Sequence, residues 1–168
     1  MPTELLSVFV RGLPAGMPRP RARAIPNGHG GHIATVYQPT TEDGHTLPWK
    51  AWHDAILRTV RSCHRGQALE GLMRLDCDVF FTRPERLLKP KSPLGKIGHG
   101  SKPDGDNVWK LIADALTEAE VWKDDSQISE CEIRKYYVAR GDASGARIVV
   151  TRLDDPEPCI FMALPAPR

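Results

Sequence analysis

The segment Lys102–Gln127, KPDGDNVWKLIADALTEAEVWKDDSQ, decides the fold. Its apolar residues recur at intervals of three and four, which is the period of an α-helix with one buried face. The members of this stripe are Val108, Leu111, Ile112, Ala115, Leu116 and Ala119. The spacing therefore predicts a buried helix that follows Asp106 and stops near Glu120.

Acidic residues lie at both ends of this predicted helix. Asp104 and Asp106 precede it, and Asp124 and Asp125 follow it after a short turn. Carboxylate oxygens suit Mg²⁺ or Mn²⁺, ions that bind few carboxylates and keep water molecules for a substrate phosphate. The alternative is a simple helix cap, because aspartate is a favoured N-cap residue. A cap requires one aspartate, whereas this segment supplies two and a separate pair.

The order Lys-Pro-Asp-Gly-Asp-Asn-Val-Trp-Lys, then Asp-Ala-Leu, then Asp-Asp-Ser-Gln resembles the RusA family of Holliday junction resolvases. The match is dense across residues 102–135 and looser over 5–153. The resemblance implies a Mg²⁺-dependent homodimeric endonuclease that nicks four-way DNA junctions. Mn²⁺ is expected to substitute for Mg²⁺, and no organic cofactor is expected.

The resemblance also assigns the residues of the site. It implies that Asp104, Asp106 and Asp125 bind the metal ion and take part in catalysis. Lys110 stands where the family has a catalytic lysine, four residues after the second aspartate. Asp106, Lys110 and Asp114 are spaced at i, i+4 and i+8, which places them together on the polar face of the predicted helix.

Length and composition indicate one domain. A chain of 168 residues can bury its own core, and we expect the domain at 1–153 and a mobile tail at 154–168. The net charge of +2 says little about partners. The four widely spaced cysteines indicate reduced thiols of a cytoplasmic protein. No apolar run is long enough to span a membrane, so the expected protein is intracellular and associated with DNA.

Other segments show the period of a strand or of a helix. The predicted strands are Leu5–Val10, Leu72–Phe81, Ile128–Val138 and Ala146–Leu153, and a further helix is predicted at Leu47–Cys63. The expected order is strand, helix, strand, main helix and a closing hairpin. This order predicts an α+β fold, with a mixed β-sheet packed against helices on one face.

The loop predicted at Gly12–Pro26 is basic. It carries Arg19, Arg21 and Arg23, whose side chains point the same way if the chain is extended. A solvated loop is one interpretation. We favour phosphate contact by Arg19 and Arg21, because their Arg-Pro-Arg sequence resembles the segment after the first strand in many RusA-like proteins.

A second basic loop is predicted at Thr82–Ser101, directly before the acidic motif. It includes Lys89 and Lys91, and Lys102 follows it. Basic, flexible chain beside carboxylates attracts a DNA backbone that the carboxylates alone would repel. Lys135 is unusual on an otherwise apolar strand face, and RusA-like sequences also have a lysine there. All four lysines are therefore predicted to contact DNA. The alternative is that the loop at Thr82–Ser101 is only a solvated linker.

Two further patterns fit a structural role better than a functional one. His29 and His32 lie in a glycine-rich loop without a third ligand nearby, so a metal site is rejected. Asp76 and Asp78 alternate along a predicted strand on its wetter face. We interpret them as surface residues or as supports of the site.

Two other functions remain open at this point. A restriction-type or general branched-DNA nuclease would use Pro103-Asp104 with a downstream acidic-x-Lys motif, but Glu132-Ile133-Arg134 ends in arginine. A non-catalytic DNA-binding protein would need the basic loops alone. It leaves the acidic residues unexplained, because neighbouring like charges are costly without a cation. The expected reaction is therefore hydrolysis of a DNA phosphodiester by metal-activated water.

Overall fold

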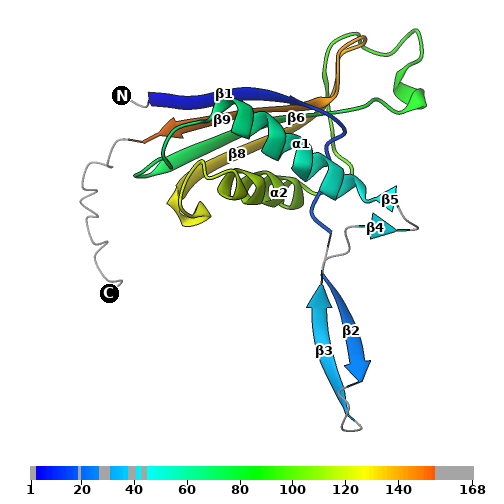
Figure 1. Cartoon of the computed structure of the whole chain (residues 1–168). Coiled ribbons are helices and arrows are strands. Elements are labelled where there is room, and N and C mark those ends of the chain that lie inside the picture. Colours follow the sequence, from blue (N-terminus) through cyan, green and yellow to red (C-terminus); the bar gives the residue numbers. More distant parts are fainter. Residues whose placement is uncertain (1–2, 19, 27–30, 38–40, 43–44, 154–168) are drawn as a thin grey trace, which may run out of the picture.

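The computed structural model shows one mixed sheet with two helices on one of its faces (Figure 1). The helices are α1 (Pro48–Cys63) and α2 (Gly105–Glu118). The predicted α+β fold is confirmed. The structure describes residues 3–18, 20–26, 31–37, 41–42 and 45–153. The tail predicted at 154–168 lies outside these residues.

The sheet has five strands in the order β1-β9-β6-β8-β7. Only β6 and β8 are parallel; the other neighbours are antiparallel. The strands are β1 (Thr3–Arg11), β6 (Met73–Phe81), β7 (Ile97–Gly98), β8 (Ile128–Tyr137) and β9 (Gly145–Arg152). The parallel pair follows from α2, because a helical crossover returns the chain to the same end of the sheet.

The predicted closing hairpin is wrong. β8 and β9 follow each other in the chain, but β6 lies between them, and β9 pairs with β6 and β1. The reason is burial. Ala146, Ile148 and Val150 are fully buried on the helix-facing side of β9, and the position between β1 and β6 sets them in the middle of the core. Proximity in sequence favours a hairpin, but tertiary packing decides the neighbour.

The apolar stripe of α2 is buried as predicted. Leu111, Ile112 and Leu116 have no exposed surface and pack into the core between the helix and the sheet. The helix ends at Glu118, and Glu120 then adopts a positive φ of 60°. The burial of this one face holds α2 in a fixed position against the sheet.

Helix α1 also matches its prediction. Pro48 occupies its first turn, where a missing N–H costs nothing. Trp52, Ile56 and Val60 are buried, so Trp52 is a core residue. The two helices pack against each other, α1 on the β1 side and α2 on the β8 side of the sheet.

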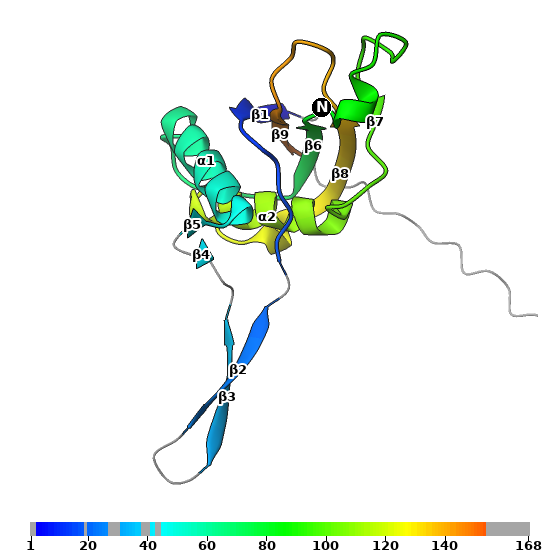
Figure 2. The ribbon, with the colours of Figure 1, turned by 90° about the vertical axis from the view of Figure 1, so that its right-hand side faces the viewer.

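A two-stranded arm extends away from the sheet (Figure 2). It consists of β2 (Arg21–Pro26) and β3 (His32–Tyr37), which are antiparallel and exposed throughout. The loop predicted over Gly12–Pro26 is therefore wrong from Arg21 onward. The Arg-Ala alternation of β2 lacks the apolar face of a typical strand. Its pairing depends on β3, which local sequence does not show.

A second, smaller hairpin follows the arm. It pairs β4 (Thr41–Glu42) with β5 (His45–Thr46), directly before α1.

The basic loop after β6 is more ordered than predicted. It contains the 3-10 helix η1 (Glu85–Leu87) and strand β7. Arg83 is buried, and its guanidinium donates hydrogen bonds to five backbone carbonyls. These belong to Leu87, Pro93, Leu94, Gly95 and Val138. Arg140 donates to the carbonyls of Leu88 and Lys89 from outside. The expectation of a flexible segment is therefore wrong, because buried arginine donors fix its backbone.

Within the described residues, no helix is both long and apolar enough to cross a membrane. Cys63, Cys77 and Cys131 are free thiols, and Cys159 lies outside the described residues. Burial raises the pKa of Cys77 well above its usual value, so this thiol stays protonated.

We predict that Arg83→Lys destabilises the protein by about 2 kcal/mol, because lysine lacks the planar fork that serves several carbonyls at once. Urea unfolding measures the loss, and limited proteolysis should cut first within residues 84–98. Arg86→Lys is the matched control, since Arg86 is exposed in the same loop. Equal stability of the two variants would contradict the structural role of Arg83.

Candidate functional site

Two acidic side chains stand free at the start of α2. Asp104 occupies the N-cap position but makes no capping hydrogen bond, and Asp106 lies in the first turn. Both are exposed, and within the described residues neither carboxylate has a hydrogen-bond or ion-pair partner. Capping therefore does not explain Asp104. The positive end of the helix dipole favours two negative charges here, and their oxygens are available to a ligand.

Lys135 on β8 holds the chain that leads into α2. Its ammonium donates to the carbonyl oxygens of Ser101 at 2.9 Å and Pro103 at 2.7 Å. This explains a lysine beside Val79 on the apolar, helix-facing side of the sheet. Lys135 thus positions the acidic motif, and its direct contact with DNA stays a prediction.

The chain after β1 supports the same turn from the other side. The amide of Met17 donates to the carbonyl of Asn107 at 3.1 Å. Gly16 has no room for a side chain, since a Cβ there would lie 2.8 Å from Cβ of Pro103. Beside this contact is a polar hollow of about 530 Å³. It is lined by Gly16, Met17, Lys102, Pro103, Asp104 and Asn107.

The two aspartates of the second acidic pair, Asp124 and Asp125, have different roles. Asp124 caps the 3-10 helix η2 (Asp125–Gln127), accepting a hydrogen bond from the amide of Ser126 at 2.9 Å. Gln127 completes the capping box by accepting from the Asp124 amide at 3.4 Å. Hydrogen bonds from Ser126 also hold the pKa of Asp124 below its usual value. Asp125 is exposed and takes no part in the cap, so its carboxylate stays available.

The structure does not bring the three predicted ligands together within one chain. Asp104 and Asp106 lie at one end of α2 and Asp125 beyond the other (Figure 1). Those ends are about 20 Å apart, because α2 has 14 residues and a helix rises 1.5 Å per residue. Across the described part of the chain, no three His, Cys, Asp or Glu side chains are placed to hold one metal ion. The ligand assignment stays a prediction.

Lys110 lies on the exposed face of α2, as its spacing predicted. Its ammonium is 3.3 Å from the Asp114 carboxylate, one turn further along the helix. Such an exposed pair adds little stability. Lys110 can therefore exchange Asp114 for a substrate oxygen at little cost.

The basic residues predicted to bind DNA occupy separate places. Arg21 lies in the arm, Lys89 and Lys91 are exposed on the loop ordered by Arg83, and Lys102 lines the hollow beside Asp104. Arg19 lies outside the described residues. The structure therefore offers a DNA backbone several cationic contacts rather than one patch, and each contact stays a prediction.

A protein-family model described as Endodeoxyribonuclease RusA matches residues 12–151. The chain belongs to the RusA family. A curated relative from Bacillus subtilis (strain 168), "Uncharacterized protein YqaN", is 32% identical over 84 residues, which are 46% of this chain and 58% of that protein. The chain thus spans little more than half the length of this relative. The RusA match includes both acidic groups that flank α2.

In this RusA-family chain, the charged residues Glu132 and Arg134 of the incomplete restriction-type motif form ion pairs on the open face of the sheet. Arg134 forms ion pairs with Asp78 at 2.6 Å and with Glu132 at 2.5 Å. Asp76 is likewise paired, with Arg74 at 2.8 Å. These charges alternate with the helix-facing residues of β6 and β8, so they point away from α2. Asp76 and Asp78 are therefore surface ion-pair partners.

Sequence reasoning missed His99, which lies next to the acidic turn. Its ring packs between those of Phe81 and Tyr137, with ring centroids 4.2 Å and 4.5 Å away. Its backbone amide donates to the carbonyl of Lys135. Burial lowers the pKa of His99, and the nearby charge of Lys135 lowers it further. No local pattern signals this position, because it depends on the pairing of β7 with β8.

We predict that Asp124→Ala lowers the urea midpoint of unfolding, because the capping box of η2 is lost. Asp125→Ala is the matched control and should leave the midpoint unchanged, since its carboxylate serves no cap. Chemical denaturation followed by circular dichroism measures both. A loss from Asp125→Ala as large as that from Asp124→Ala would contradict the division of roles.

We predict that His99 makes stability depend on pH. Its folded pKa is below the ordinary value of 6.5, so the unfolded chain takes up the proton first as the pH falls. The wild type should therefore lose stability as the pH falls below about 6.5. His99→Phe keeps the aromatic packing but lacks this proton, so its advantage over the wild type should grow between pH 8 and pH 5 in urea unfolding. A constant difference would contradict the assignment.

Proposed function

We propose that the chain is a Mg²⁺-dependent endonuclease that resolves four-way DNA junctions by paired nicks, with Mn²⁺ able to replace Mg²⁺. One observation carries the proposal: in a RusA-family chain, the carboxylates of Asp104 and Asp106 lie at the exposed start of α2 with no partner among the described residues. Family membership supports cleavage of DNA. The free acidic oxygens support the metal-dependent form of that reaction.

The residues at the start of α2 fit a divalent ion. Mg²⁺ is held through one or two carboxylates and otherwise by water and phosphate oxygens. Asp104 and Asp106 supply this number of carboxylates without breaking a bond within the described residues. When bound, the ion would supply an activated water and neutralise charge on the phosphate. The hollow of about 530 Å³ beside Asp104 leaves room for the phosphate.

Protein groups around the two aspartates have distinct roles in this proposal. Lys110 follows Asp106 by one helical turn, and its ammonium stabilises a non-bridging phosphate oxygen after leaving Asp114. Lys102, at the rim of the hollow, holds a neighbouring phosphate. Lys135 keeps the turn before α2 in place through its bonds to backbone carbonyls.

We further propose that a second copy of the chain completes the site. Asp125 lies beyond the far end of α2 from Asp104 and Asp106, and the two ends of this helix are about 20 Å apart, a distance that one ion cannot bridge. If two α2 helices lie side by side in opposite directions, Asp125 of one copy reaches Asp104 and Asp106 of the other. Two nicks placed symmetrically also require two sites, which an isologous dimer provides.

The outer edge of β8 is suited to this pairing. Among the described residues, β7 pairs with Tyr136 and Tyr137 at that edge, and the amide of His99 donates to the carbonyl of Lys135. The rest of this edge of β8 has no strand partner in the described part of the chain. An unpaired strand edge is a template for another strand. The start of α2 lies over β8, because a Cβ on Gly105 would contact Ile133 at 3.6 Å. Antiparallel pairing of two β8 edges would therefore set two α2 helices side by side in opposite directions.

We predict that Asp104→Asn, Asp106→Asn and Asp125→Asn each reduce junction cleavage about 100-fold or more, since each removes a carboxylate from the centre that stabilises the transition state. Junction binding should stay equal or become tighter, because a charge that repels phosphate is lost. Ca²⁺ should support binding without fast cleavage, as it tolerates looser geometry.

Gel assays on synthetic four-way junctions, with and without Mg²⁺, measure both quantities. Asp114→Asn is the matched control, because it changes a carboxylate on the same helix that only pairs with Lys110. Full activity of all three variants would contradict the proposed function.

We predict that the cations of the arm and of the loop each contribute phosphate contacts. Arg21→Gln, or Lys89→Gln with Lys91→Gln, should weaken binding to all junction sequences alike. Each lost contact should flatten the slope of log K against log salt by about one unit. Arg58→Gln, an exposed change on α1, should leave the slope unchanged. An unchanged slope in the arm and loop variants would show that these residues do not contact DNA.

A further inference from the structure

The sheet face opposite the helices carries a row of aromatic side chains. Phe9 on β1 and Phe80 on β6 have ring centroids 6.3 Å apart. Phe80 and Tyr136 on β8 are stacked at 5.7 Å, with an interplanar angle of 24°. Their neighbours along each strand are buried on the helix side, so the three rings share the open face. Phe9 is 44% exposed, far more than a core aromatic.

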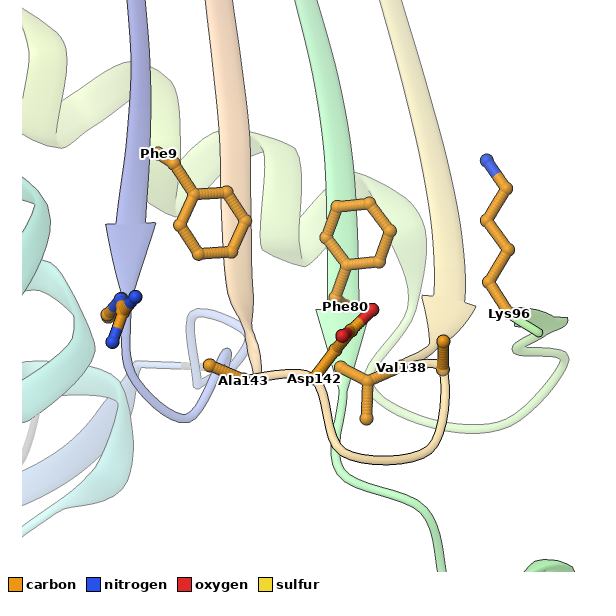
Figure 3. Close-up of a pocket in the computed structure, with 8 residues that line it drawn as sticks. Phe9, Phe80, Lys96, Val138, Asp142 and Ala143 are labelled. Atoms are coloured by element: carbon orange, nitrogen blue, oxygen red, sulfur yellow. The ribbon is translucent and has the colours of Figure 1, made fainter. Parts of the chain in front are cut away.

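A hollow of about 370 Å³ lies over this row (Figure 3). Phe9 and Phe80 lie side by side on its floor, and the loop between β8 and β9 supplies Val138, Asp142 and Ala143 at its border. Gly145 on β9 makes the arrangement feasible, because a Cβ there would lie 3.0 Å from the Phe9 ring. The aromatic floor is therefore accessible from solvent and backed by rigid strands.

Charged groups border the aromatic floor. The ammonium of Lys96 lies 4.1 Å from the centroid of the Tyr136 ring, which is a cation–π contact. Arg11 lines the hollow from β1, and Asp142 is its acidic group. Aromatic rings on a sheet with flanking cations are the features that bind single-stranded nucleic acid. A purely apolar partner would leave Arg11 and Lys96 without a counterpart.

We propose that this hollow binds an unpaired nucleobase of single-stranded DNA. The base stacks on Phe9 and Phe80, and its flanking phosphates reach Arg11 and Lys96. Asp142 accepts a hydrogen bond from an exocyclic amine of the base, as carboxylates do with cytosine. The inference extends the proposed function, because a nuclease acting on branched DNA meets unpaired bases. It needs neither metal ion nor the carboxylates of α2.

The geometry connects this subsite to the start of α2. Phe9, Phe80 and Tyr136 lie near the C-terminal ends of their strands. The loop from β6 returns to α2 at that same end, where Lys135 holds Pro103. A strand seated in the hollow therefore lies at the edge of the sheet where the free carboxylates stand, but on the opposite face.

Binding of a fluorescent single-stranded oligonucleotide in EDTA tests the proposal without cleavage. Combining Phe9→Leu with Phe80→Leu keeps apolar surface but removes the rings, and should weaken affinity about tenfold or more. Phe9→Tyr keeps a ring and should bind as the wild type does. Leu88→Ala is the control, because Leu88 is 51% exposed on the neighbouring loop. An oligonucleotide containing 5-iodouracil should cross-link to Phe9, Phe80 or Tyr136.

Unchanged affinity of the double leucine variant, or cross-links confined to the arm, would overturn the proposal. So would a change in sedimentation without a change in affinity, which would make this face a protein interface. Asp106→Asn protein separates the two hypotheses. If it binds the oligonucleotide normally but still cleaves junctions, the assignment of Asp106 to the cleavage site fails and the base subsite stands. If the leucine variant cleaves normally and binds normally, only the subsite fails.

Discussion

The rigidity of one buried helix is the constraint on which this structure depends. The apolar stripe of α2 is packed between the sheet and α1, so the two ends of the helix are held about 20 Å apart. The same crossover makes β6 and β8 parallel and leaves the outer edge of β8 almost unpaired. The positions of Asp104 and Asp106 at one end, and of Asp125 beyond the other, follow from that packing.

The residues around the acidic groups differ in how their hydrogen bonds are used. Supporting side chains are fully engaged: Lys135 holds the turn before α2, Arg83 orders the basic loop, and Asp124 caps η2. The carboxylates of Asp104 and Asp125, by contrast, are exposed and free of partners within the described residues. One set of side chains thus stabilises the backbone, and a different set keeps its carboxylates available. A binding site requires both, because its ligands must stay free while the backbone that carries them stays fixed.

Periodicity alone predicted the elements whose burial is one-sided. The stripe of α2, helix α1 and the alternation of β6 are local patterns, and the spacing of the motif pointed to the acidic residues. The arm, the central position of β9 and the burial of Arg83 depend on partners far along the chain, which no local pattern contains. One signal was present in the sequence: a 14-residue helix separates the acidic pairs by about 20 Å unless the chain after it folds back.

Mixing two inactive variants tests the shared site most directly. Consider a dimer of one Asp106→Asn chain and one Asp125→Asn chain. If the sites are shared between copies, one of the two sites keeps all its wild-type ligands and the other carries both changes. Purified mixed dimers, selected through two different tags, should therefore regain Mg²⁺-dependent nicking of a supercoiled cruciform plasmid and give open circles. If each site were built within a single chain, both sites of the mixed dimer would carry a change. Mixed dimers as inactive as either parent would contradict the account.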